Sequence, residues 1–311
     1  MVKELTKLHP MVQFKKDTWE IDEFDAASPF LLIGSEKAML IDCGMGIGDL
    51  LGAVRMITDK PLIVVITHAH IDHTGNICQF EEAWIHGKDM AQAAPAPLER
   101  RRASVSRIAQ RQKGVLGAPY TMFRLYPFDL YTDLREPEGP MPVLHEITDG
   151  MEFDLGGGRI VTAYECPGHT PGEIVLLDHQ TRSLFAGDAV NFNLLASACP
   201  VETTLRYLKR LQSMKDQYDG IYNGHHDFRA FGAPLDEDCL PTIIEMLEGV
   251  LRGEIWPTEN PSLFGRQPLP LTGTDHLSPE EMSMKRFAEG RITLRRGRNY
   301  VAIDPKRILE E

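Results

Sequence analysis

Four side chains that can bind a metal ion lie within six residues of one another, in the motif H-A-H-I-D-H. They are His68, His70, Asp72 and His73, and they directly follow the segment Pro61–Thr67, whose length and β-branched residues predict a buried strand. In an extended loop His68 and His70 point to the same side, because side chains alternate with a period of two. Asp72 and His73 then begin the next turn and can face a second point. Imidazole and carboxylate groups are ligands that zinc, iron and manganese accept. This loop is therefore predicted to supply ligands to two different metal ions.

Three later segments repeat one pattern, in which a predicted strand ends beside a potential metal ligand. A glycine comes before the ligand in each segment, and glycine lets the backbone approach a crowded centre closely. Each segment alone could be a simple turn. Beside the H-A-H-I-D-H motif, however, all three indicate one shared site. The pairs are Ile160–Glu165 before His169, Ser183–Ala186 before Asp188, and Gly220–Tyr222 before His225 and His226.

The elements expected around these residues alternate between strands and helices. Apolar runs predict further strands at Phe30–Ile33, Ala38–Ile41, Ala83–His86 and Ile174–Leu177. The tail has one apolar stretch, Tyr300–Ile303, and could add a strand or subunit contacts. Helical spacing of apolar residues, or helix-forming composition, predicts helices at Asp49–Thr58, Leu98–Lys113, Thr203–Lys215 and Pro241–Leu251. The strands are therefore expected to position the ligand loops, and the helices to cover the strands.

The segment from about Lys88 to His145 differs in composition from its surroundings and is predicted to be an insertion that covers the site. It joins an arginine-rich helix to a stretch rich in Gly, Pro, Tyr and Phe. The arginines of the insertion and of the tail could recognise an anionic substrate, but a solvated helix face and an exposed tail are the favoured interpretation. The aromatic residues could wall a pocket or form the segment's own small core. The residues concerned are Arg100, Arg101, Arg102, Arg107, Arg111, Lys113, Tyr120, Phe123, Tyr126, Phe128, Arg291, Arg295, Arg296 and Arg298.

The overall composition indicates an acidic globular protein of the cytoplasm. The 33 Lys and Arg residues against 45 Asp and Glu residues give a net charge of −12, which disfavours nucleic-acid binding. The five cysteines are scattered and odd in number, as expected for thiols in a reducing compartment. No secretory signal or membrane span is apparent, so we expect neither membrane association nor a nucleic-acid partner. A small-molecule substrate is expected, and formation of a homo-oligomer stays open.

The motifs H-A-H-I-D-H, P-G-H-T-P-G, A-G-D and N-G-H together resemble those of the metallo-β-lactamase superfamily. Within that superfamily the sequence looks most like the hydrolase branch typified by hydroxyacylglutathione hydrolase (glyoxalase II). The resemblance extends from about Phe30 to Gly253, apart from the insertion. It implies an α/β (α+β) fold, a four-layer αββα sandwich in which two facing mixed sheets carry helices outside. We expect this domain to span residues 1–255, and residues 256–311 to form a C-terminal extension that packs on it.

The same resemblance implies a pair of divalent metal ions, with zinc expected and iron or manganese as alternatives. Asp188 would bridge the ions, and Asp72 would also orient a shared hydroxide, so these two are the predicted catalytic residues. Two adjacent dications lower the pKa of a shared water to about neutral. The implied ligands are His68, His70 and His169 for one ion, and Asp72, His73 and His225 for the other.

Two neighbouring positions keep alternative interpretations. His225 and His226 are adjacent, and the family's Gly-His pattern favours His225 as the ligand. His226 would then support a ligand or face solvent. Asp42 matches a recurrent acidic position in the family's first glycine turn, where a supporting role is expected rather than direct ligation.

The predicted reaction is hydrolysis of an ester, thioester or lactone of a small molecule by a metal-bridging hydroxide. One alternative is a mononuclear iron enzyme similar to persulfide dioxygenases, which keep the same motif residues. Another is a phosphodiesterase of the same fold, although such enzymes usually add a nucleic-acid domain or a basic arm. A non-catalytic binding module is the least favoured interpretation, because the ligand set is complete.

Overall fold

The computed structural model describes residues 8–114, 133–226, 229–253, 292–297 and 299–310. Seven strands form the largest sheet in the order in which they follow one another along the chain. The first four pair antiparallel, and the last four pair parallel. They are β1 (Met11–Lys15), β2 (Thr18–Ile21), β3 (Phe30–Ile33), β4 (Ala38–Ile41), β5 (Leu62–Val65), β6 (Glu82–His86) and β7 (Val143–Ile147).

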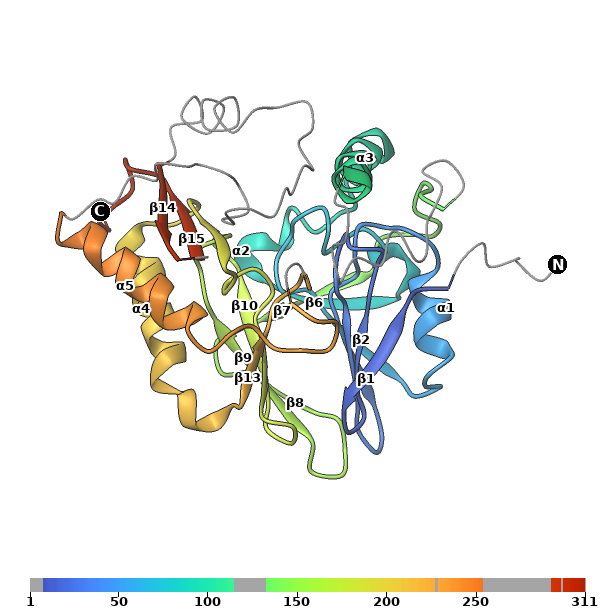
Figure 1. Ribbon diagram of the computed structural model, residues 1–311. Coiled ribbons are helices and arrows are strands. Elements are labelled where there is room, and N and C mark those ends of the chain that lie inside the picture. The colour runs from blue at the N-terminus through green and yellow to red at the C-terminus, as the bar shows by residue number, and fades with distance from the viewer. Residues whose placement is uncertain (1–7, 115–132, 227–228, 254–291, 298, 311) are drawn as a thin grey trace.

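A second sheet of five strands faces the first, and a third sheet of three strands lies beside it (Figure 1). Strands β11 and β13 pair parallel, and the other pairs of the five-stranded sheet are antiparallel. Its order is β13 (Gly220–Tyr222), β11 (Ser183–Phe185), β10 (Ile174–Asp178), β9 (Ile160–Glu165) and β8 (Glu152–Asp154). The three-stranded sheet has the order β12 (Asn193–Ala196), β15 (Asn299–Ile303) and β14 (Ile292–Arg296).

Helices lie outside both large sheets, which gives the four layers of an αββα sandwich (Figure 1). Helix α1 packs on the outer face of the seven-stranded sheet, and α4 and α5 pack on the outer face of the five-stranded sheet. Two short 3-10 helices, η1 (Ile77–Gln79) and η2 (Lys215–Gln217), complete the described helical elements. The α-helices are α1 (Leu50–Arg55), α2 (Gly87–Met90), α3 (Leu98–Gly114), α4 (Val201–Ser213) and α5 (Cys239–Leu251).

Alternation along single strands explains how one chain forms three apolar layers. Phe30 and Leu32 of β3 point into the core between the two sheets, whereas Leu31 points out toward α1. Phe185 lies in the same central core, with its ring centroid 4.8 Å from that of Phe30. A strand buried on both faces needs apolar residues at every position, which is why these segments are continuous apolar runs. The predicted fold class is confirmed.

The predicted strands and helices are found with small shifts of their ends, and several strands were missed. Strands β9 and β13 have the predicted bounds, whereas α4 begins two residues early, directly after Pro200. The sequence did not indicate β1, β2, β7, β8, β12 or β14, because most of them carry charged or polar side chains. Strand β7 begins at Val143, so the last residues of the expected insertion belong to the large sheet.

The end of the chain returns to the body of the fold. Strand β15 pairs parallel with β12, and the Tyr300 amide donates to the Phe192 carbonyl at 2.6 Å. The Val201 amide, at the start of α4, donates to the Arg307 carbonyl at 2.9 Å. Residues 254–291, which hold most of the expected extension, lie outside the described part of the chain. Among the described helices, none combines the length and the apolar character needed to cross a membrane.

Replacing Phe185 by alanine tests the core between the sheets. The side chain is fully buried, and its ring also lies 5.8 Å from that of Tyr222. Phe185→Ala removes these contacts and leaves a cavity, which lowers the free energy of unfolding by about 3–5 kcal/mol. Urea unfolding followed by circular dichroism measures the loss. Val143→Ala, at a position 61% exposed, is the control and should change stability by less than about 0.5 kcal/mol. Equal effects of the two variants would contradict this core.

Candidate metal centre

The loop after β5 is fixed at its first residue by a carboxylate from the neighbouring strand. Asp42, directly after β4, accepts hydrogen bonds from the Thr67 amide at 2.7 Å and from the Thr67 hydroxyl at 2.9 Å. Its Oδ2 atom also lies 2.8 Å from Nδ1 of His73. Asp42 has a φ of +64°, a strained conformation for a residue with a side chain. It therefore holds both ends of the loop and directs the other nitrogen of His73 toward the site.

The loop itself turns so that its four candidate donor side chains face two points. The His73 amide donates to the His70 carbonyl at 3.0 Å, which closes the turn. Nε2 of His68 lies 3.1 Å from Nδ1 of His70, and Nε2 of His73 lies 3.8 Å from Oδ1 of Asp72. The structure thus brings together the four side chains that were singled out in this motif.

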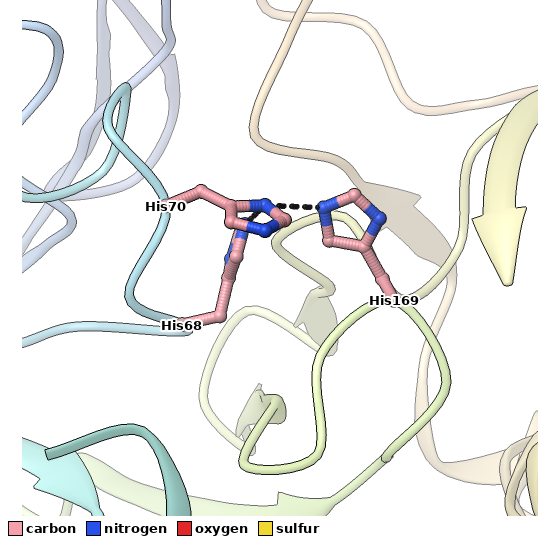
Figure 2. Close-up of side chains that lie close together, drawn as sticks. All are labelled: His68, His70 and His169. Carbon is pink, nitrogen blue, oxygen red and sulfur yellow. Dashed lines mark hydrogen bonds between the residues drawn. The ribbon is translucent and has the colours of Figure 1, made fainter. Parts of the chain in front are cut away.

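The three other predicted ligands reach the same place from the second sheet. Strands β9, β11 and β13 all end at this edge, because β11 and β13 are parallel and β9 runs in the same direction two strands away. Nε2 of His169 lies 2.8 Å from Nδ1 of His70, and the imidazoles of His68, His70 and His169 converge from two loops in Figure 2. The Ile174 amide of β10 donates to the Thr67 carbonyl at 3.0 Å, which joins the two sheets here.

Asp188 lies between the two halves of the arrangement. Its Oδ2 atom is 3.4 Å from Nε2 of His169, and its Oδ1 atom is 3.4 Å from Nε2 of His225. Nε2 of His225 is also 3.5 Å from Oδ2 of Asp72. The glycine before His225 is required, because a Cβ at Gly224 would lie 2.7 Å from Cε1 of His73.

Within the described residues, three sets of donors at this edge have ligand atoms that all lie within 4.8 Å of one another. We call their members together the seven-residue cluster. The sets share His68 and His73, so they form one continuous cluster with two ends. They are His68, His70 and His169; His68, His73 and Asp188; and Asp72, His73 and His225.

The chemistry of these donors fits metal ions. Nε2 of His73 and Oδ1 of Asp188 are buried and have no hydrogen-bond partner among the described residues. A buried polar atom without a partner costs free energy, and an ion between these atoms would remove that cost. Imidazole and carboxylate are the donors that such ions accept.

The protonation of the histidines agrees with this interpretation. Burial, and then the neighbouring imidazoles, lower the pKa of His68 well below its usual range and that of His70 to about 4. Neutral imidazole is the form that binds a metal. Burial also lowers the pKa of His73, but Asp42 and Asp72 outweigh it and raise the value to about 9. Burial raises the pKa of Asp188, yet the facing His225 and His169 hold it well below its usual range. The carboxylates around His73 therefore favour a positive charge on its imidazole, and a metal ion at Nε2 would supply a positive charge at the same position.

His225 and His226, which the sequence could not separate, point to different surroundings. His225 contacts Asp72 and Asp188 of the seven-residue cluster. His226 is 3% exposed, and its ring nitrogens lie 3.2 Å from Asp22 and 3.1 Å from Asp25. The geometry therefore favours His225 as the ligand, and His226 does not face solvent.

Several buried carboxylates around the cluster were not indicated by the sequence. Oε1 of Glu173 accepts from the Asp188 amide at 2.7 Å. Asp89 accepts from the Ala69 and Gly172 amides, which belong to the two loops that bear His68 and His169. The acidic segment 20–25 is the larger omission, because charged residues in a strand are usually exposed. The glutamate that follows P-G-H-T-P-G was the one available signal.

The arginine-rich helix α3 packs against the loop of the H-A-H-I-D-H motif through apolar side chains. Leu98 and Val105 pack in a small core that includes Ile71 of the ligand loop. Arg101 is 1% exposed and donates to the carbonyls of Ala96 at 3.0 Å and Arg135 at 2.7 Å. It therefore anchors the helix and is not available to a substrate.

The remaining residues of the arginine-rich and aromatic groups are either paired with a glutamate, exposed, or outside the described side chains. Arg102 pairs with Glu99, and Arg296 pairs with Glu245. Arg100 is exposed on α3. The side chains of the others lie outside the described part of the chain. They are Arg107, Arg111, Lys113, Tyr120, Phe123, Tyr126, Phe128, Arg291, Arg295 and Arg298.

Comparison with known proteins agrees with the fold and the motifs. Residues 23–225, more than half of the chain, match the model of the metallo-beta-lactamase superfamily. The chain is 29% identical over 221 residues to the acyl-coenzyme A thioesterase MBLAC2 of Gallus gallus, which covers 67% of this chain and 74% of that protein. It is 28% identical over 224 residues to the acyl-coenzyme A thioesterase MBLAC2 of Homo sapiens, covering 67% and 75%.

A solved structure shows the same fold at lower identity. The metallo-beta-lactamase from Pontibacter korlensis superposes with a TM-score of 0.52 and 17% identity, and the match covers 77% of this chain and 99% of that one. The seven-residue cluster lies within or at the end of the region matched to the superfamily. The chain therefore belongs to the metallo-β-lactamase superfamily of hydrolases.

Proposed function

We propose that this protein hydrolyses the thioester of a small molecule of the acyl-coenzyme A class, with two divalent metal ions at the seven-residue cluster. The observation that carries the proposal is the meeting of two three-donor sets on either side of Asp188. The two MBLAC2 relatives are named acyl-coenzyme A thioesterases, which supports a thioester among the bonds that such a centre can cleave. Zinc is the proposed metal.

The proposed ligand sets follow the geometry of the two ends of the cluster. Asp188 is proposed as the shared ligand, since each of its oxygens faces a histidine of a different set. Bound ions would lower the pKa of a shared water toward neutrality and polarise the thioester carbonyl. His68, His70 and His169 would hold one ion, and Asp72, His73 and His225 the other.

The residues of the chain supply orientation and the handling of a proton. Asp42 fixes His73, and Glu173 fixes the backbone of Asp188, so the donors keep their places without rearrangement. Asp72 has a side chain that is 24% exposed, more than the 15% of Asp188, so solvent reaches Asp72 more readily. We propose that Oδ1 or Oδ2 of Asp72 accepts a hydrogen bond from the attacking water and orients it toward the carbonyl carbon.

Metal content is the first test of the proposal. The purified protein should bind two equivalents of zinc, measured by elemental analysis after dialysis against metal-free buffer. Stripping with a chelator should abolish hydrolysis, and two equivalents of Zn²⁺ should restore it. A folded protein that retains activity without metal, or that takes up only trace metal, would contradict the two-metal proposal.

The substrate class is tested by release of a thiol. The zinc-loaded enzyme should cleave acyl-coenzyme A substrates, and a thiol-reactive dye should detect one free thiol per acid formed. Cleavage of esters or lactones without cleavage of thioesters would replace the proposed bond. Consumption of oxygen with a persulfide substrate, or cleavage of bis-p-nitrophenyl phosphate as the main activity, would point to the corresponding alternative reactions.

Single-histidine variants test the ligand sets separately. His169→Ala and His225→Ala should each reduce zinc content from two equivalents toward one, and each should lower kcat/KM by at least about 100-fold, because a ligand is lost. His179→Ala is the matched control. His179 is exposed at the far end of β10, where Nε2 lies 2.8 Å from the Thr162 hydroxyl. Normal zinc content in either ligand variant would exclude that histidine from the site.

A further inference from the structure

His226 directly follows His225 of the candidate metal centre, and its side chain lies in a second polar cluster. Its Nδ1 atom is 3.0 Å from the Ser28 hydroxyl and 3.2 Å from Oδ1 of Asp22, and its Nε2 atom is 3.1 Å from Oδ1 of Asp25. All four side chains are at least nine-tenths buried. Both nitrogens of the imidazole therefore face oxygen atoms of the protein, and the ring cannot turn without losing these contacts.

The order Ser28, His226, Asp25 resembles a nucleophilic triad, but the surroundings exclude that role. Ser28 is 1% exposed, so a substrate cannot reach its hydroxyl. Asp22 also faces the nitrogen that would have to take the serine proton. A nucleophile needs access and a free base, and this cluster offers neither. The contacts of His226 with Ser28, Asp22 and Asp25 instead hold the backbone at His226 in place.

The backbone next to His226 is held from two sides. The Gly224 carbonyl accepts from the Ser28 amide at 2.8 Å, and the Gly224 amide donates to the Gly187 carbonyl at 2.7 Å. Gly187 directly precedes Asp188. The hydrogen bond between Gly224 and Gly187 therefore links the loop that bears His225 to the proposed bridging carboxylate. His225 stands between this link and the buried ring of His226, which leaves its Cα little freedom to move.

A buried ion pair holds the loop farther along. The guanidinium of Arg229 pairs with Glu20 at 2.7 Å, and both residues are buried. Arg229 also donates to the Asn223 side chain at 2.9 Å, just before the ligand loop. Glu20 accepts from the Gly232 amide as well, so strand β2 holds both Asn223 and Gly232. Among the side chains that attach this loop, that of His226 is the nearest to His225 in the sequence.

We infer that His226, held by Asp25, Asp22 and Ser28, is a positioning residue that sets the place of His225 in the metal centre. This inference rests on the proposed two-metal function. The reasons are geometric. Among the described contacts, His226 has none with the six members of the seven-residue cluster other than His225. It is, however, the next residue after His225 in the chain, so its place constrains that of His225. Residues that orient a metal ligand typically change affinity by about 10–100-fold when they are removed. Loss of His226 should therefore weaken the metal ion at the His225 end and spare the ion at the His169 end.

Zinc titration of the metal-stripped, full-length protein against a chromophoric chelator tests this inference. In His226→Gln one of the two zinc ions should lose about 10–100-fold in affinity while the other keeps its wild-type value. Asp25→Asn, which keeps the volume of the side chain, should shift the same ion in the same direction by a smaller factor. Visible absorption of the Co²⁺-loaded protein gives a second readout, since only the bands of the affected ion should change.

His9→Gln is the matched control, because His9 is also buried but bonds to a backbone carbonyl, that of Ile47 at 2.8 Å. It should leave both zinc affinities unchanged. Unchanged affinities in His226→Gln, or equal weakening of both ions, would overturn the inference. So would failure of both His226→Gln and Asp25→Asn to fold, because the cluster would then serve the fold as a whole. A wild-type protein that binds fewer than two zinc ions would instead contradict the proposed function.

Discussion

The structure depends on keeping seven imidazole and carboxylate side chains together at one edge of the sandwich. Imidazoles and carboxylates gathered at one place lose hydration, and buried polar groups without partners cost free energy. The neighbouring network offsets this cost with hydrogen bonds to buried carboxylates. Asp42 holds His73, and Glu173 holds the amide of Asp188. These hydrogen bonds hold His73 and the backbone of Asp188 in place within the cluster.

The sandwich makes this arrangement available because it brings the ends of several strands to one edge. Strands β4 and β5 are parallel in one sheet, and β11 and β13 are parallel in the other, so the loops that follow them start side by side. The hydrogen bond between Ile174 and Thr67 joins the two sheets at this edge. Apolar residues fill the space between the sheets, and the polar residues of the cluster gather where the strands end. Helix α3 then packs over the loop through Ile71.

The sequence predicted the seven-residue cluster because the identity of its members is local information. A motif such as H-A-H-I-D-H brings four donors together with almost no help from the rest of the chain, and each later ligand follows a recognisable strand. The supporting residues could not be predicted in this way. Glu20 and Arg229 are separated by 209 positions, and nothing in either segment indicates that the two charges meet in the interior. His226 was likewise ambiguous until its partners at positions 22, 25 and 28 were known.

The same distinction applies to the insertion and to the first strands of the chain. The arginines of α3 form a cluster of charge in the sequence, but Arg101 is used to satisfy backbone carbonyls. Strand β2 escaped prediction because it contains a charged residue, Glu20, which is buried with Arg229 and the Gly232 amide as partners. Periodicity reports where apolar side chains go, and it is silent about charges that are buried with a partner.

Anomalous X-ray scattering from crystals of the zinc-loaded protein tests the central claim most directly. Two peaks at the zinc absorption edge, about 3.5–4 Å apart and on either side of Asp188, are the expected result. One peak should contact His169 and the other His225. A single peak, or zinc bound where His169, Asp188 and His225 do not meet, would contradict the two-metal centre.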